Sequence, residues 1–141
     1  MSEPASPTVD WPALRAAARA AAAHSYSPYS GFAVGAAAFT EDGRLIVGAN
    51  IENASYGLTM CAENGLVAAH QMGGGGRLVA ITAVGNGAPV TPCGRCRQLL
   101  WEFGGPDCLV DVDGAPTRLA VLLPSAFPDA STFRSPAHGG T

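Results

Sequence analysis

Apolar residues recur at two different spacings along the chain, and each spacing predicts one kind of element. Near the start every third or fourth position is apolar, which predicts a helix. Its apolar face consists of Trp11, Leu14, Ala18 and Ala21. Asp10 precedes this stretch and can cap the helix, because its side chain can accept a hydrogen bond from an unpaired backbone N–H. A loop rich in turn-forming residues is expected at 24–31.

Further along, short apolar runs bounded by turn residues predict strands. They occupy residues 32–39, 45–51, 78–84, 108–112 and 115–119. Asp42-Gly43, between the first two runs, is a strong signal for a hairpin turn. Two more helices are predicted at 61–72, where a glycine run ends the helix, and at 92–103. This order predicts an α/β fold, with a mixed five-stranded sheet and helices on both faces.

Length and composition predict one domain. A chain of 141 residues can bury roughly two thirds of its unfolded surface. We expect the domain to span 9–128, between a disordered tail at 1–8 and a flexible tail at 129–141. No run approaches ~18 uninterrupted apolar residues, so we expect no membrane partner. We expect a cytoplasmic location instead. Four cysteines in a reducing compartment are more typical of metal ligands or catalytic groups than of disulfides.

The charge balance argues against a nucleic-acid partner. The formal net charge is -3, and the eight basic residues are scattered along the chain. A protein that binds a phosphate backbone normally presents a clustered basic surface. Only 13% of the residues are charged and 48% are hydrophobic, which leaves few charges for the surface. We therefore expect part of the surface to be buried against other copies of the chain.

Two cysteine motifs carry the candidate chemistry. Cys61 stands two residues before Glu63, and Cys93 and Cys96 form a CxxC pair. Structural zinc sites normally have four protein ligands, whereas catalytic sites have three and leave one position for water. Three thiols with a nearby carboxylate therefore predict an open zinc site that activates water, with Glu63 moving the proton. Cys108 lies in an apolar run and is more typical of a buried small hydrophobic residue than of a fourth ligand.

Both motifs fall at predicted helix starts, where unpaired N–H groups and the helix dipole favour thiolates. Three thiolates leave excess negative charge around a dication, and Arg95 and Arg97 are available to offset it. The spacing of Cys61 and Glu63 raises a geometric difficulty. Residues two apart on a regular helix point to nearly opposite sides, so these two can share a site only if the cleft crosses the mouth of the helix.

These residues resemble the cytidine deaminase family. The sequences CAE at 61–63 and PCGRCRQ at 92–98 are similar to the zinc signature of that family. Three further blocks are similar to its first strand, its nucleoside-binding segment and its C-terminal segment. They are YSPYSGFAVGA at 26–36, NIENASY at 50–56 and LLPSAF at 122–127. The resemblance covers all but the two tails. It implies the family's three-layered fold and its small homotetrameric class, with one zinc ion per subunit held by three cysteines.

The resemblance also implies a role for individual residues. Zinc would be held by Cys61, Cys93 and Cys96, and Glu63 would be the catalytic acid and base. Substrate contacts are implied for Phe32, Asn50, Glu52, Ala54, Tyr56, Ala62 and Phe127. Of these, the side chains at 50 and 52 would hold the ribose hydroxyls, the phenyl ring at 32 would pack on the base, and residues 54, 56 and 127 would reach a neighbouring subunit's site.

The implied reaction is hydrolysis of cytidine and deoxycytidine to uridine and deoxyuridine, with release of ammonia, in pyrimidine salvage. A carboxylate close to the sugar would repel a nucleotide's phosphate, so a free nucleoside is the expected substrate. One position departs from the family pattern. Many three-cysteine members have, directly after the catalytic Glu, an arginine that bonds the zinc thiolates, and this chain has Asn64.

Three alternatives stay open at this point. A deaminase of a cytosine nucleoside antibiotic, of the blasticidin S type, shares PCGRCRQ but differs in the nucleoside-binding segment. A zinc-stabilised scaffold would need a fourth protein ligand, from Cys108, His70 or His24. An enzyme that edits nucleic acid would share the chemistry, but it would call for a basic and aromatic surface that this acidic chain does not indicate.

Overall fold

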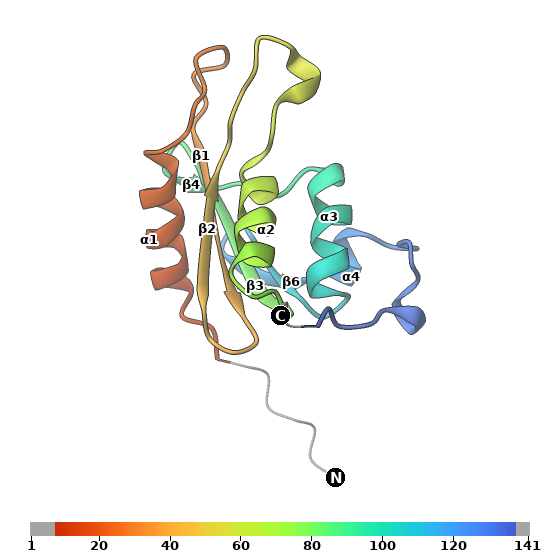
Figure 1. The fold of residues 1–141 in the computed structure, drawn as a ribbon. Helices are drawn as coiled ribbons and strands as arrows, with labels where there is room; N and C mark the ends of the chain where they lie inside the picture. Colours follow the sequence, from red (N-terminus) through yellow and green to blue (C-terminus); the bar gives the residue numbers. More distant parts are fainter. Residues whose placement is uncertain (1–7, 138–141) are drawn as a thin grey trace.

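A mixed six-stranded sheet forms the middle of the computed structural model, which describes residues 8–137 (Figure 1). The strands are ordered β2-β1-β3-β5-β6, and β4 pairs with β3 beside this path. β3 and β5 are parallel, and the other pairs are antiparallel. Their bounds are Val34–Thr40 (β1), Leu45–Ala49 (β2), Leu78–Gly85 (β3), Ala88–Pro89 (β4), Leu109–Val112 (β5) and Ala115–Arg118 (β6).

Helices cover both faces of the sheet, which gives three layers (Figure 1). α1 (Trp11–Ala22) lies on one face, and α2 (Ala62–Met72) and α3 (Gly94–Gly104) lie on the other. A short α4 (Leu119–Leu122) follows β6. The predicted α/β class, with helices on both faces, is confirmed. The predicted number of strands was one too few, because β4 is only two residues long and shows no alternation that a sequence pattern could reveal.

Only parts of the two predicted tails fall within the described residues. Of the N-terminal tail at 1–8, only Thr8 is described, and residues 138–141 of the C-terminal tail also lie outside the described part. Residues after 128 form a short 3-10 turn, η2 (Ala130–Thr132). The ring of Phe133 then packs on Gly105, where an added Cβ would lie 2.3 Å from it.

β1 is built almost entirely from small residues, and both of its faces are buried. Ala36 and Ala38 belong to the core between the sheet and α2 and α3, whereas Ala37 belongs to the core beneath α1. This alternation is the period of two that a strand imposes on its side chains. The larger core residues come from the helices and from β3, among them Leu14, Leu66, Ile81 and Trp101. Small residues in the strand let the helices lie close to the sheet on both sides.

Two glycines permit the closest of these approaches. A Cβ at Gly48 in β2 would lie 2.4 Å from the Ala62 carbonyl oxygen and 2.5 Å from the Leu66 nitrogen, both in α2. A Cβ at Gly35 in β1 would lie 1.9 Å from the Ala18 carbonyl oxygen in α1. Real Cβ atoms are not found at such distances from backbone atoms, so glycine is required at both positions. Gly48 thereby fixes where the first turn of α2 lies on the sheet.

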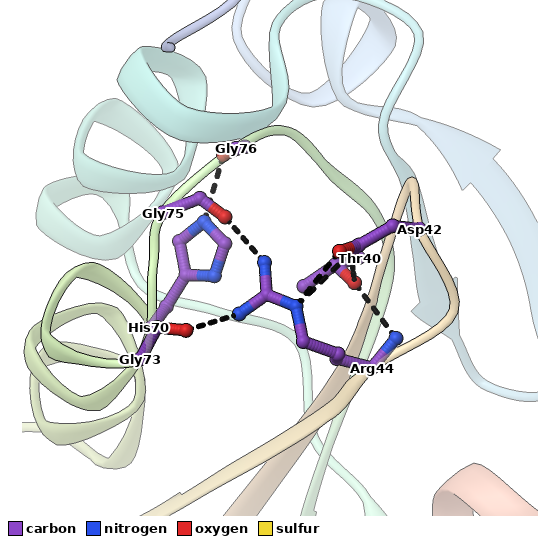
Figure 2. Close-up of polar contacts among 7 residues, drawn as sticks. All are labelled: Thr40, Asp42, Arg44, His70, Gly73, Gly75 and Gly76. Carbon is purple, nitrogen blue, oxygen red and sulfur yellow. Dashed lines mark hydrogen bonds and ion pairs between the residues drawn. The ribbon is translucent and has the colours of Figure 1, made fainter. Parts of the chain in front are cut away.

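The far end of α2 is fixed by polar contacts (Figure 2). Arg44, from the β1–β2 hairpin, donates to the carbonyl oxygens of Gly73 at 2.7 Å and Gly75 at 2.5 Å. The buried His70 donates from Nε2 to the Gly76 carbonyl oxygen at 2.7 Å, since a carbonyl can only accept. Asp42 binds the Arg44 guanidinium from the other side. The glycine run predicted to end this helix is therefore an ordered turn.

We predict opposite effects for two glycine-to-alanine substitutions at the α2–β2 contact. Gly48→Ala should lower the free energy of unfolding by about 2 kcal/mol, because the new methyl group overlaps the α2 backbone. Gly65→Ala in α2 should raise it by about 0.5 to 1 kcal/mol, because alanine favours a helix and the nearest atom is 3.8 Å away. Urea unfolding of both variants measures the difference, and equal changes would contradict the close-packing argument.

Candidate metal centre

Cys61 and Cys93 each stand immediately before a helix. They are the N-cap residues of α2 and α3, with extended backbone angles of φ -65° and ψ 159° for Cys61 and φ -67° and ψ 168° for Cys93. Cys96 follows in the first turn of α3. Because Cys61 lies outside the helix, its side chain is not held to the helical projection. The expected difficulty with Glu63 is thus resolved, and both residues line one cavity.

The three cysteines converge on one point. Their sulfur atoms all lie within 4.8 Å of one another, and no other such group of potential metal ligands occurs among residues 8–137. With Zn–S bonds of about 2.3 Å, a tetrahedral ion needs sulfurs about 3.8 Å apart, so the arrangement fits zinc after a small contraction. Cys108 is buried elsewhere, and burial raises the pKa of its thiol to about 12. The fourth protein ligand that a scaffold would need is not found among the described residues.

The three thiols differ in their electrostatic surroundings. Burial raises the pKa of Cys61 and of Cys96 above the usual thiol range, and the Glu63 carboxylate contributes in the same direction. Burial also acts on Cys93, but the backbone N–H groups of Cys96 and Arg95 bind its sulfur and bring its pKa below the usual value. The start of α3 therefore stabilises one thiolate, as helix N-termini are expected to do.

Glu63 is the buried carboxyl group of the site. Its residue is only 5% exposed, and burial raises its pKa above the usual range, partly offset by a hydrogen bond with Cys96. A carboxyl group with a raised pKa is better able both to accept and to return a proton near neutral pH than an ordinary glutamate. Its place beside three thiols and a cavity distinguishes it from a solvated helix residue.

Asn64 contacts one of the three metal-binding thiols, that of Cys96. Its Oδ1 lies 3.8 Å from the Cys96 sulfur, and the same amide, if rotated by half a turn, would offer two N–H donors to a thiolate. Arg97 instead donates to the carbonyl oxygens of Pro92 at 2.8 Å and Leu122 at 2.9 Å. Within the described part of the chain, no contact joins Arg95 or Arg97 side chains to the sulfurs. The two arginines therefore remain a prediction, and Asn64 is the side chain that the structure places there.

A cavity of about 250 Å³ opens beside Cys61 and Cys93. It brings together several residues predicted for the site, namely Phe32, Asn50, Cys61, Ala62, Glu63 and Cys93. Val34, Thr59, Met60, Val90, Thr91 and Pro92 also line it. None of these six was predicted as a site residue, although all but Val34 stand within three residues before Cys61 or Cys93, which is the signal that could have located them.

Other predicted substrate contacts lie outside this cavity. Glu52 and Tyr56 line a second cavity of about 260 Å³, which shares Thr59 with the first. Ala54 and Phe127 line neither of the two cavities. Tyr56 is 76% exposed and Phe127 is 82% exposed. One chain thus assembles the metal centre and the floor of the site, but not all of the predicted contacts.

The comparison with known families decides what this centre is. The family model described as the cytidine and deoxycytidylate deaminase zinc-binding region matches residues 12–111. The chain belongs to this deaminase family. Zinc is accordingly its cofactor, and Cys61, Cys93 and Cys96 are positioned to hold the ion.

Individual relatives match this chain over most of their length. A cytidine deaminase from Mycobacterium tuberculosis is 56% identical over 122 residues, which cover 86% of this chain and 92% of the relative. One from Halalkalibacterium halodurans is 46% identical over 109 residues, which cover 73% and 83%. The crystal structure of the M. tuberculosis cytidine deaminase matches with a TM-score of 0.83 and 55% identity, covering 85% of this chain and 98% of that one. The M. leprae structure matches with a TM-score of 0.82 and 53% identity, covering 84% and 100%.

This deaminase shares its fold with these relatives, and its chemistry is that of a zinc-dependent enzyme. Within residues 8–137, no helix has the length and hydrophobicity needed to cross a membrane.

We predict that zinc binding to the metal-free protein weakens steeply as the pH falls. The raised pKa values of Cys61 and Cys96 mean that both thiols are protonated at neutral pH and must lose their protons to bind the ion. For each proton that zinc binding releases, the apparent affinity for zinc falls about tenfold when the pH is lowered by one unit. Competition with a chromogenic chelator between pH 6 and pH 8 measures this slope. A pH-independent affinity would contradict the assignment, and Cys108→Ala should keep one zinc ion per chain.

Proposed function

We propose that this enzyme hydrolyses cytidine and deoxycytidine to uridine and deoxyuridine, with release of ammonia, in pyrimidine salvage in the cytoplasm. The observation that carries the proposal is the buried Glu63 carboxyl group beside three converging thiols, at the floor of a cavity that also holds Phe32 and Asn50. Relatives of high identity that are named cytidine deaminase support the same reaction. We place the catalytic domain at residues 9–128.

Glu63 is the group that moves protons in this mechanism. Zinc bound by the three cysteines would lower the pKa of a coordinated water and so supply the nucleophile for C4 of the base. Glu63 carries both protons of the consumed water, one to N3 and one to the departing amino group, so that water is converted into the new carbonyl oxygen and ammonia forms. Its burial matters twice, because it raises the pKa of the carboxyl group and excludes competing water.

The remaining cavity residues hold the nucleoside in place. Phe32 offers a ring edge or face to the base, and Asn50 and Glu52 offer an amide and a carboxylate to the sugar hydroxyls. The Ser30 hydroxyl and the N–H groups of Ser30 and Tyr29 hold the pKa of Glu52 below its usual range, so the carboxylate stays charged. A fixed negative charge near the sugar disfavours a phosphate there, which supports nucleoside over nucleotide.

We also propose a homotetramer in which subunits share their sites. Several large apolar side chains are exposed in one chain, and Tyr29 and Tyr56, with ring centroids 6.2 Å apart, border the second cavity. The exposed side chains include Tyr26, Tyr29, Ile51, Tyr56, Leu58 and Phe127. Exposed apolar side chains at the border of a ligand cavity are typical of a subunit interface, and residues 54, 56 and 127 would there complete a neighbour's site. Sedimentation velocity tests the assembly and should show four chains of 14.2 kDa each. A monomer that turns over cytidine would contradict it.

The antibiotic deaminase considered from the sequence is not favoured. The relatives reported above are all named cytidine deaminase, and Asn50 lies in the same cavity as Glu63, where an ordinary ribose would need it.

We predict that Glu63→Gln keeps zinc and loses turnover. The amide is close in shape to the carboxyl group but cannot accept a proton, so kcat should fall by about 10²- to 10⁴-fold. Metal analysis and the loss of cytidine absorbance measure the two quantities. Glu102→Gln, on the exposed face of α3, is the matched control and should keep full activity. A Glu63→Gln enzyme of near-normal rate would rule out the proposed mechanism.

A further inference from the structure

The orientation of the Asn50 side chain is fixed by two backbone groups of the segment that leads into β1. Its Oδ1 accepts a hydrogen bond from the Val34 N–H at 2.9 Å, and its Nδ2 donates to the Phe32 carbonyl oxygen at 2.9 Å. A backbone N–H can only donate and a carbonyl oxygen can only accept. The amide can therefore adopt only one of its two orientations.

Ser25 completes the coordination of this amide. Its hydroxyl oxygen lies 2.5 Å from Asn50 Oδ1 and 3.2 Å from the Asn50 carbonyl oxygen, so the hydroxyl donates toward Oδ1. Both lone pairs of Oδ1 are then used, and one N–H of Nδ2 is left. Asn50 is only 8% exposed and lines the cavity beside Glu63. The group that it can offer to a ligand is consequently a hydrogen-bond donor.

Ser30, in the same loop, holds Glu52 in a similar way. The Ser30 hydroxyl donates to Glu52 Oε2, and the backbone N–H groups of Tyr29 and Ser30 donate to Oε1 at 3.0 and 3.1 Å. The Ser30 oxygen also accepts from the Phe32 N–H at 2.9 Å, which ties the loop to the start of β1. The carboxylate keeps free lone pairs only on its outer side, where it faces the second cavity.

We propose that Ser25 and Ser30 are positioning residues for nucleoside binding: Ser25 fixes Asn50 as a donor, and Ser30 fixes Glu52 as an acceptor. A sugar hydroxyl can both accept and donate, so a site with one fixed donor and one fixed acceptor recognises hydroxyls and gains nothing from a sugar that lacks them. Ser25 does not line either cavity and acts only through Asn50. This inference rests on the proposed cytidine deaminase activity.

The test compares two ligands that differ only in the sugar hydroxyls. Steady-state kinetics give KM and kcat for cytidine, and competition gives the inhibition constant of 2′,3′-dideoxycytidine. For Ser25→Ala and for Ser30→Ala we expect the KM for cytidine to rise by about fivefold to tenfold, the effect of one lost hydrogen bond. The kcat should stay within about twofold, because neither serine reaches Glu63 or the cysteines. The inhibition constant of dideoxycytidine should not change.

Two further variants separate positioning from a general structural role. Ser25→Thr keeps the hydroxyl and should have a KM near that of the wild type. Ser135→Ala removes an exposed serine far along the sequence and should change neither ligand's affinity. Equal weakening of cytidine and dideoxycytidine, or an unchanged KM in both alanine variants, would overturn the proposal. Absence of cytidine turnover by the zinc-loaded wild type would instead overturn the proposed function.

Discussion

The structure depends on two helices beginning at the same point. Cys61 and Cys93 are the residues directly before α2 and α3, so their sulfurs can meet only if both helix starts meet. Three thiolates in a partly buried site are costly unless N–H groups and the metal ion offset their charge. The N-terminal turn of α3 supplies such groups to Cys93, which is the one thiol of the three with a lowered pKa. The position of the helices is therefore an electrostatic requirement as much as a packing one.

The small-residue sheet is what allows this convergence. Gly48 admits the backbone of α2, and the alanines of β1 leave room for helices on both faces. The opposite layer is held by the most buried ion pair of the described chain, in which Arg15 of α1 donates to the fully buried Asp111 of β5 at 2.8 Å. Thr82 of β3 donates to the same carboxylate at 2.8 Å, so one acidic side chain joins three elements. In a chain with few charged residues, the Asp111 carboxylate thus connects a helix layer to the sheet.

The sequence predicted the parts of the structure that have a period or a motif. Five of the six strands, the three long helices and the cysteine cluster follow from alternation, from helix-stop glycines and from ligand spacing. What could not be predicted depends on contacts between distant segments. Ser25 and Ser30 belong to a serine-rich loop whose composition indicates only a turn, and their partners lie more than 20 residues away. The contact of Asn64 with Cys96 likewise joins two helices, so the spacing of residues along one helix cannot predict it.

The two ends of the site differ in how far a single chain shields them from water. At the end that we propose for the base, Glu63 is 5% exposed, so hydrogen bonds there form away from water and are strong. At the end that we propose for the sugar, Glu52 lies in a cavity bordered by Tyr29 and Tyr56, which are 50% and 76% exposed. A hydrogen bond from a sugar hydroxyl to a wet carboxylate replaces one from water and gains little. Covering this end with another copy of the chain would remove that water, and would make the hydroxyl contacts selective without any change at the metal.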